Sequence, residues 1–116
     1  LEPVLVAADI PELQRAARAV KVHPDVLSYA VSLVRATREE EGLFLGASPR
    51  GTIFLVRTSQ ARAFLSGRDF VTPDDIKAMA VPVLSHRVIP SSRSRRLDDA
   101  RSLVMKATES IPVPVL

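Results

Sequence analysis

Residues 42–51 read Gly-Leu-Phe-Leu-Gly-Ala-Ser-Pro-Arg-Gly and separate two long stretches that have helical periodicity. Ser48 followed by Pro49 predicts a helix start, because serine is a good N-cap and proline fits the first helical position. Arg50 then falls in the first turn, where the helix dipole favours acids over cations. A cation at this position is explained if an anion from outside this segment binds there, and phosphate is the usual anion at helix N-termini. The competing interpretation is a solvated surface arginine.

The same stretch contains the glycine spacing of a phosphate-binding P-loop, from Gly46 to Gly51. A P-loop requires Lys and then Ser or Thr after the second glycine, and it follows a β-strand. Thr52 and Ile53 stand at those two positions, and the preceding segment has helical periodicity. The sequence therefore contains no nucleotide-hydrolysing loop of this kind.

The composition indicates one small domain with an aliphatic core. The chain has 116 residues, of which 47% are hydrophobic and only 4% aromatic, so the core is expected to consist of Ala, Val, Leu and Ile. The absence of cysteine excludes disulfides, thiol catalysis and cysteine-ligated metals. His23 and His86 are far apart in sequence, so no metal site is expected. No apolar run approaches the roughly 20 residues of a membrane span, and no signal peptide is visible. A cytoplasmic protein, or a piece of one, is expected.

The charge balance is weakly basic, with 16 Lys and Arg against 13 Asp and Glu, or +3 at pH 7. The tight basic cluster consists of Arg93, Arg95 and Arg96, and Asp98 and Asp99 follow it at once. No aromatic side chain interleaves with this cluster, so a base-stacking nucleic-acid surface is not expected. We interpret residues 91–96 as a solvated polar loop.

Apolar periodicity predicts an all-α fold, a small helical bundle of about five helices. Helices are expected over residues 9–20, 24–40, 48–66, 72–86 and 97–109. Residues 88–90 are expected to be extended and leave room for one minor extended pair. Residues 1–8 form a lead-in or linker, and residues 111–116 form an extended tail because prolines interrupt them.

Local signals define the ends of several of these helices. His23 before Pro24 is expected to be an N-cap or loop residue, and Gly67 is expected to end the third helix. Residues 72–75, Thr-Pro-Asp-Asp, combine a cap, a first-position proline and two acids at the positive end of the dipole. Pro82 predicts a break or kink near Val81.

The periodicity also predicts which side chains are buried. The second helix has a strong apolar stripe, and the third is apolar around much of its girth, as is usual for a central helix. The inner stripes consist of Leu13, Ala16, Ala17 and Val20 in the first helix and of Val26, Leu27, Ala30, Leu33, Val34 and Thr37 in the second. The third helix is expected to be central because of Ile53, Phe54, Leu55, Val56, Ala61, Ala63, Phe64 and Leu65.

The reactive residue types do not assemble an active site. Asp74 and Asp75 are explained as helix-capping acids rather than as an acid–base pair. Ser48 has no histidine in a local motif that would activate it as a nucleophile. The domain by itself is therefore not expected to catalyse a reaction.

Several motifs together resemble the C-terminal helical lid of MoxR-family AAA+ ATPases. The similarity covers the chain from Leu1 to about Arg87 and weakens in the tail. The motifs are residues 2–5, Glu-Pro-Val-Leu; residues 33–38, Leu-Val-Arg-Ala-Thr-Arg; residues 46–50, Gly-Ala-Ser-Pro-Arg; residues 61–63, Ala-Arg-Ala; residues 67–76, Gly-Arg-Asp-Phe-Val-Thr-Pro-Asp-Asp-Ile; and residues 83–87, Val-Leu-Ser-His-Arg. Residues 46–50 are the most specific of these, whereas the Thr-Pro-Asp-Asp segment is common capping chemistry.

The resemblance implies that the lid, over residues 9–110, follows an α/β core that carries Walker A, Walker B and sensor 1. Arg50 matches the sensor 2 arginine, which contacts the γ-phosphate of ATP bound with Mg²⁺ to that core. Ala47 and Ser48 match backbone positions near the nucleotide. Arg87 matches a His-Arg pair for which a structural or inter-subunit role is expected. Gly51 stands where family members usually have alanine.

The resemblance further implies a chaperone-like, ring-forming ATPase that acts beside proteins with von Willebrand factor A domains. Two other function classes stay open on the residues alone. One is a stand-alone helical protein-interaction module, and the other is a small nucleic-acid-binding helical domain, which would need a basic face. Neither the client, the ring size nor the choice between action of Arg50 in cis or in trans follows from the sequence.

Overall fold

The computed structural model describes residues 1–40, 43–90 and 97–115. In these residues the chain forms five helices and one pair of short antiparallel strands, which confirms the predicted all-α bundle and the minor extended pair. The elements are α1 (Asp9–Arg18), α2 (Pro24–Glu39), β1 (Leu43–Leu45), α3 (Pro49–Leu65), α4 (Pro73–Leu84), β2 (Ile89–Pro90) and α5 (Leu97–Glu109).

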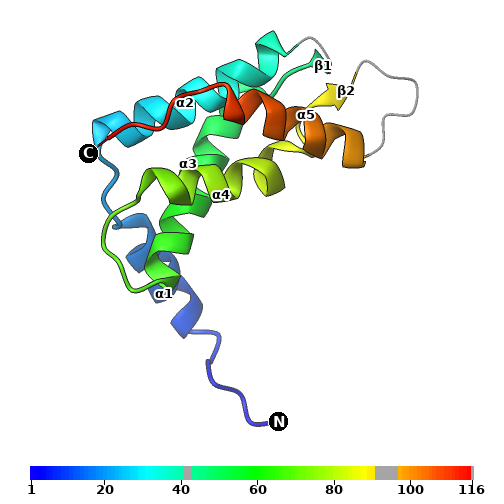
Figure 1. Ribbon diagram of the computed structural model, residues 1–116. Helices are drawn as coiled ribbons and strands as arrows, with labels where there is room; N and C mark the ends of the chain where they lie inside the picture. The colour runs from blue at the N-terminus through cyan, green and yellow to red at the C-terminus, as the bar shows by residue number, and fades with distance from the viewer. Residues whose placement is uncertain (41–42, 91–96, 116) are drawn as a thin grey trace.

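Helix α3 is the element around which the others pack. It contacts α1, α2 and α4, and α5 lies across α2 and α4 (Figure 1). The largest fully buried apolar side chains come from three of these helices, namely Leu33 of α2, Leu55 of α3, and Ile76 and Leu84 of α4. The N-terminal segment leads away from the bundle beyond α1 (Figure 1). The core is aliphatic, as the composition predicted.

The helix ends follow the local chemistry of the sequence. The Asp25 backbone N–H donates to Nδ1 of His23 at 3.1 Å, so His23 is the N-cap of α2. Thr72 and Asp75 form a reciprocal capping box at the start of α4. Gly67 has φ 78° and follows α3, and the N–H of Arg68 donates back to the Ala63 carbonyl at 2.9 Å. These predicted helix boundaries are confirmed.

The predicted burial of α2 and α3 was partly wrong. Four side chains assigned to the inside are exposed: Leu27 at 44%, Ile53 at 55%, Phe54 at 43% and Leu65 at 84% of their full accessibility. Helix α3 buries one narrow side, formed by Gly51, Leu55, Ser59 and Ala63. Because consecutive residues turn by about 100°, Ile53, Phe54 and Leu65 point away from that side. Val56 and Phe64 are partly buried and pack against the core.

A break or kink was predicted near Val81, and the break does not occur, because α4 continues through Pro82 to Leu84. Proline removes one backbone donor, whose acceptor in a regular helix is the carbonyl four residues earlier, at Ala78. Pro82 and Ala78 are both exposed. Water can therefore satisfy the Ala78 carbonyl, and the proline is tolerated in the last turns of the helix.

Helix α1 is attached to the bundle by hydrogen bonds more than by buried side chains. It ends at Arg18 and contains no buried residue. Of the inner face predicted for this helix, only Val20 is buried, and Val20 follows the end of the helix. The side-chain amide of Gln60 in α3 donates to the carbonyls of Arg18, at 3.2 Å, and Val20, at 2.8 Å. Lys21 forms an isolated bridge with Phe70, which joins the α1–α2 link to the segment before α4.

Some predictions lie outside the described residues. They are the polar loop at residues 91–96 with Arg93, Arg95 and Arg96, the start of the loop after the second predicted helix at Glu41 and Gly42, and Leu116 of the tail. Among the helices that are described, none has the length and apolar character needed to cross a membrane.

Candidate functional site

The start of α3 carries the three residues that the sequence singled out. Ser48 occupies the N-cap position with extended backbone, at φ −74° and ψ 166°, and Pro49 takes the first helical position. Arg50 follows and is exposed. The position predicted for Ser48 is confirmed, but its side chain makes no capping hydrogen bond. Residue 49 is a proline and has no N–H, and the N–H of Gly51 donates to the Ser48 carbonyl at 2.8 Å. Among these first described positions, the N–H of Arg50 is therefore the one that lacks the side-chain acceptor a serine cap usually supplies.

Two side chains from the last turn of α2 fix the backbone just before this helix. The N–H of Ala47 donates to Oγ1 of Thr37 at 2.9 Å, and the Ala47 carbonyl accepts from Nε of Arg38 at 2.9 Å. Thr37 is fully buried and also donates to the Val34 carbonyl at 2.6 Å. Ala47 is itself fully buried. The approach to Ser48 is thus set by α2 through both polar backbone groups of one residue.

Gly46 permits this close approach to α2. A Cβ atom placed on Gly46 would lie 2.5 Å from the Cα of Arg38 and 2.6 Å from its backbone nitrogen. Real Cβ atoms do not come this close to backbone atoms, so any other residue here would push the segment off α2. The Gly-Ala-Ser-Pro-Arg motif therefore describes a physical unit, in which glycine allows contact, alanine is anchored and arginine is presented.

Arg50 is presented without a local counter-charge. Within the described residues it forms no hydrogen bond and no ion pair. The first turn of α3 contains no acid, whereas α1, α2 and α4 each begin with one or two. The dipole of α3 adds partial positive charge at the same end. This combination favours an anion from outside the described chain.

A second arginine reaches α3 near this end. The guanidinium carbon of Arg87 lies 4.0 Å from the centroid of the Phe54 ring. A Cβ atom on Gly51 would lie 3.3 Å from Cδ2 of Leu84, so the end of α4 packs against the start of α3. Sequence reasoning gave Arg87 a structural or inter-subunit role and did not pair it with Phe54. That pairing depends on how α3 and α4 cross, for which the sequence carries no local signal.

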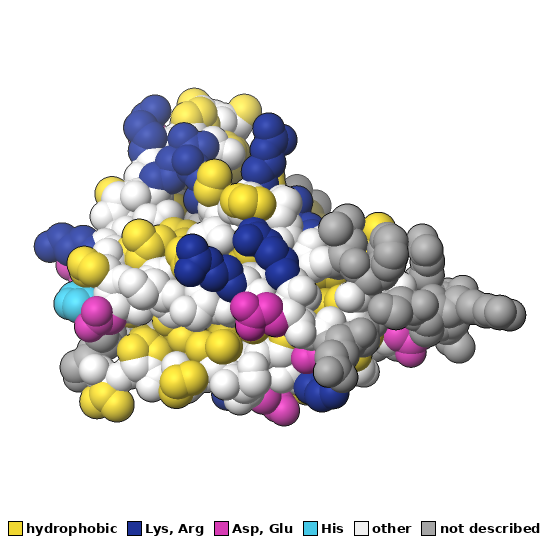
Figure 2. Space-filling model, turned by 90° about the horizontal axis from the view of Figure 1, so that it is seen from above, with side chains coloured by type: hydrophobic (Ala, Val, Ile, Leu, Met, Phe, Trp, Pro, Cys, Tyr) yellow, Lys and Arg dark blue, Asp and Glu magenta, His cyan; other side chains and the backbone are white. Residues whose placement is uncertain are grey.

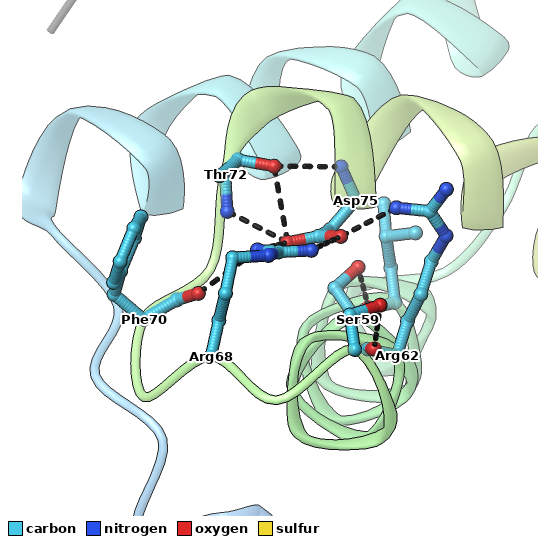
Figure 3. Close-up of polar contacts among 8 residues, drawn as sticks. Ser59, Arg62, Arg68, Phe70, Thr72 and Asp75 are labelled. Atoms are coloured by element: carbon cyan, nitrogen blue, oxygen red, sulfur yellow. Dashed lines mark hydrogen bonds and ion pairs between the residues drawn. The ribbon is translucent and has the colours of Figure 1, made fainter.

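A buried ion cluster holds the other end of the α3–α4 pair (Figure 3). The carboxylate of Asp75 is fully buried and accepts hydrogen bonds from Arg62 at 2.5 Å and from Arg68 at 2.7 Å through two nitrogens. It also accepts from the N–H of Thr72 at 2.8 Å. The prediction of Asp75 as a cap is confirmed, but its convergence with two arginines was not predicted.

The Asp75 cluster keeps the carboxylate ionised. Burial by itself would raise the pKa of Asp75, because it disfavours the charged form. Hydrogen bonds from Arg68, Thr72 and Arg62 outweigh burial and lower that pKa well below its ordinary value. Its ion pairs and hydrogen bonds therefore hold α3, the following turn and α4 together.

The start of α3 presents an exposed cation on a fixed backbone. Ala47, Ser48 and Arg50 are brought together at one helix end by the chain itself. In the part of the chain that the structure describes, no three His, Cys, Asp or Glu side chains gather as a metal site would require. What the helix end offers is a cation, the backbone N–H of Arg50 and a rigid support.

Comparison with known proteins agrees with this geometry. Residues 35–106 match the protein-family model described as the AAA lid domain. The chain belongs to this family. Over 93% of its length it also superposes on the crystal structure of a protein from Cytophaga hutchinsonii that has been provisionally described as an ATPase, with a TM-score of 0.81 and 27% identity, covering 36% of that chain.

The similar curated proteins include several MoxR proteins, which confirms the resemblance of this AAA lid domain to MoxR-family lids. The chain is 37% identical over 117 residues to YeaC of Bacillus subtilis, covering 99% of this chain and 36% of YeaC. It is 44% identical over 71 residues to protein MoxR of Methylorubrum extorquens, covering 60% of this chain and 21% of that protein. It is 33% identical over 95 residues to the chaperone MoxR1 of Mycobacterium tuberculosis, covering 74% of this chain and 25% of MoxR1. The AAA lid domain thus spans about a third or less of the length of these relatives.

Proposed function

We propose that this AAA lid domain covers ATP bound to an α/β core in a MoxR-type ATPase and that Arg50 is its sensor 2 residue. The observation that carries the proposal is the exposed Arg50 at a helix start that has neither an acid nor a side-chain cap. The membership of the lid family and the similarity to MoxR proteins support it. Residues 1–8 would link the core to the lid, residues 9–110 would form the lid, and residues 111–116 would form its tail.

Arg50 has the chemistry that a γ-phosphate requires. A guanidinium presents a planar set of N–H donors that match phosphate oxygens, and it remains charged at any physiological pH. It would neutralise the charge that develops on the transferred phosphoryl group. The anchoring of Ala47 by Thr37 and Arg38 would hold the arginine in register, and the backbone of Ala47 and Ser48 would lie near the nucleotide.

The ligands of Mg²⁺ would come from the core, because the described part of this chain gathers no carboxylate set that suits the ion. The isolated lid would bind ATP weakly or undetectably, because most contacts with the nucleotide would come from the core. In the whole protein, lid closure would couple the nucleotide state to the geometry of a ring. A chaperone-like role accords with the name of the relative MoxR1, whereas the cytoplasmic location and the von Willebrand factor A partners rest on the family resemblance.

The test is ATP hydrolysis by the full-length protein with Arg50→Ala. We expect kcat to fall about 100-fold or more, because a donor that stabilises transition-state charge is worth that much. Lys77→Gln is the matched control. Lys77 is an exposed cation of α4, and it lies away from Leu84, the α4 residue that packs against the start of α3. The melting temperature of both variants should match the wild type. Normal turnover in Arg50→Ala would refute the sensor 2 assignment.

A protein-interaction module is the second candidate, and one surface feature favours it over a nucleic-acid binder. A groove of about 380 Å³ between α1, α2 and α3 is lined by exposed Leu27 and Ile53 together with Arg18 and Arg57. On the face shown in Figure 2, Lys and Arg side chains lie in separate places with hydrophobic and acidic side chains between them, rather than in one basic surface. A partner that is retained by Arg50→Ala in a pull-down would support this module, and a mobility shift that persists at physiological salt would support nucleic-acid binding.

A further inference from the structure

We infer that Arg87 is a second phosphate-binding residue at the Arg50 site and that Phe54 is the positioning residue that holds it there. This inference rests on the proposed function and deepens it, because it assigns two contacts to one bound triphosphate. It changes the role expected for Arg87 from structural or inter-subunit to ligand binding.

Phe54 is a neighbour of Arg50 on α3. The two residues are four positions apart in α3, so their side chains are neighbours on one side of the helix. Phe54 is 43% exposed, and Arg50 is exposed. The aromatic ring therefore borders the surface on which Arg50 is presented.

Arg87 reaches this same side of α3 from the segment after α4. Leu84 at the end of α4 packs against Gly51, the residue after Arg50. Three residues after Leu84, the guanidinium carbon of Arg87 sits 4.0 Å from the centroid of the Phe54 ring. Phe54 is thus flanked by two arginines, one from its own helix and one from the segment after α4.

Arg50 and Arg87 bring two positive charges to this side of α3. Within the described chain, Arg87, like Arg50, forms no ion pair with a carboxylate. Two like charges on neighbouring sites oppose each other. Where arginines converge elsewhere in this molecule, on Asp75, a buried carboxylate compensates them. The Arg50 and Arg87 pair has no such compensation, so a polyanionic ligand from outside is the group that fits it.

The stacking geometry leaves Arg87 able to bind this ligand. A guanidinium that lies over an aromatic ring uses its flat face for the cation–π contact. Its N–H donors point outwards in the guanidinium plane and remain available to phosphate oxygens. Stacking on Phe54 also reduces the rotamer freedom that Arg87 must lose on binding, which preorganises the site.

The experiment measures steady-state ATP hydrolysis by the full-length protein with Arg87→Gln and separates KM from kcat. Arg87 reaches the site beside Phe54, about one helical turn along α3 from Arg50. We expect it to bind phosphate oxygens that are charged in the ground state as well as in the transition state, and therefore to bind both states equally. We expect Arg87→Gln to raise the KM for ATP about tenfold, as the loss of one charge-assisted contact would, and to leave kcat within about twofold. Arg50→Ala is expected to act mainly on kcat.

A matched pair of variants tests the positioning role of Phe54. Phe54→Tyr keeps an aromatic face and should leave KM near the wild-type value. Phe54→Leu keeps apolar bulk but removes the ring, and should raise KM as Arg87→Gln does. The double variant Phe54→Leu with Arg87→Gln should be no worse than Arg87→Gln alone, because both changes remove one contact. A purely structural role would instead lower the melting temperature and give additive losses.

The outcomes separate the two proposals. If Arg50→Ala abolishes turnover while Arg87→Gln and Phe54→Leu leave KM unchanged, the inference about Arg87 is wrong and the sensor 2 proposal stands. If Arg50→Ala leaves turnover intact, the proposed function itself fails. A rise in KM with Arg87→Gln and Phe54→Leu, but not with Phe54→Tyr, would support both.

Discussion

At the scale of single residues, Gly46 and Gly51 look alike in sequence but face different surroundings. Gly46 lies against the backbone of Arg38, which cannot move aside without moving α2. Gly51 lies within α3 and faces the Leu84 side chain and the Ala47 methyl. The two glycines of the apparent P-loop spacing therefore serve packing, and at only one of them is the absence of a side chain indispensable.

We predict that Gly46→Ala destabilises the chain by about 1–3 kcal/mol, the usual cost of overpacking. Gly51→Ala is the matched control and should stay within about 1 kcal/mol of the wild type, because improved helix propensity offsets a small shift of Leu84. Urea unfolding followed by circular dichroism gives both free energies. Equal effects of the two substitutions would contradict the close approach of residue 46 to α2.

Helix caps could be predicted from the sequence, whereas side-chain contacts between distant residues could not. Ser48, Thr72 and Gly67 were located correctly because caps depend on backbone geometry within a few residues. The convergence of Arg62 on Asp75 joins residues 13 positions apart, and the stacking of Arg87 on Phe54 joins two different elements. Such contacts depend on how helices cross, which local propensity does not specify.

At the scale of elements, periodicity located all five helices in the described chain but overestimated their buried faces. Helix α3 was expected to be enclosed, yet Ile53, Phe54 and Leu65 are exposed. The pattern gives the apolar residues of a helix, but not how many partners cover them. The break predicted near Pro82 does not occur for a related reason. The free-energy cost of a proline within a helix depends on whether water reaches the carbonyl that loses its donor.

Helix α1 is the element with the weakest attachment, and Gln60 is its principal polar contact with α3. We predict that Gln60→Ala speeds amide hydrogen exchange over residues 9–18 and leaves exchange in α2 and α4 nearly unchanged. Each lost hydrogen bond is worth about 1 kcal/mol, which is enough to raise local opening several-fold. Gln14→Ala, which removes an exposed amide of α1 itself, is the control. Uniform acceleration across the chain would indicate global destabilisation instead.

At the scale of the whole molecule, the chain is flat and drawn out. Its extents are 46 × 38 × 20 Å, and its radius of gyration is 15.7 Å, against about 13 Å for a compact chain of about 100 residues. The N-terminal segment and α1 account for the elongation visible in Figure 1. Stability must therefore come largely from the block of α2, α3, α4 and α5.

The buried Asp75 carboxylate makes the stability of this block depend on pH. The folded pKa of Asp75 is lowered, so its contribution to stability is fully present above its unfolded pKa of about 3.9 and is lost as the pH falls towards the folded value. We expect the free energy of unfolding to decrease as the pH falls from about 4 to about 2. Asp75→Asn should be less stable at pH 7 and should show a shallower decrease over that range. The same slope in both proteins, measured by urea unfolding at each pH, would show that other carboxylates dominate.

The polar contacts that orient the helices also have a consequence for the order of folding. The contacts that join α2 to the segment before α3 span 9 and 10 residues, and those that join α3 and the turn after it to α4 span 13 and 7. The Gln60 contacts to the end of α1 span 42 and 40 residues. Closing a longer loop costs more chain entropy and slows the formation of its contacts. During refolding, α2, α3 and α4 should therefore assemble first, and α1 should dock last.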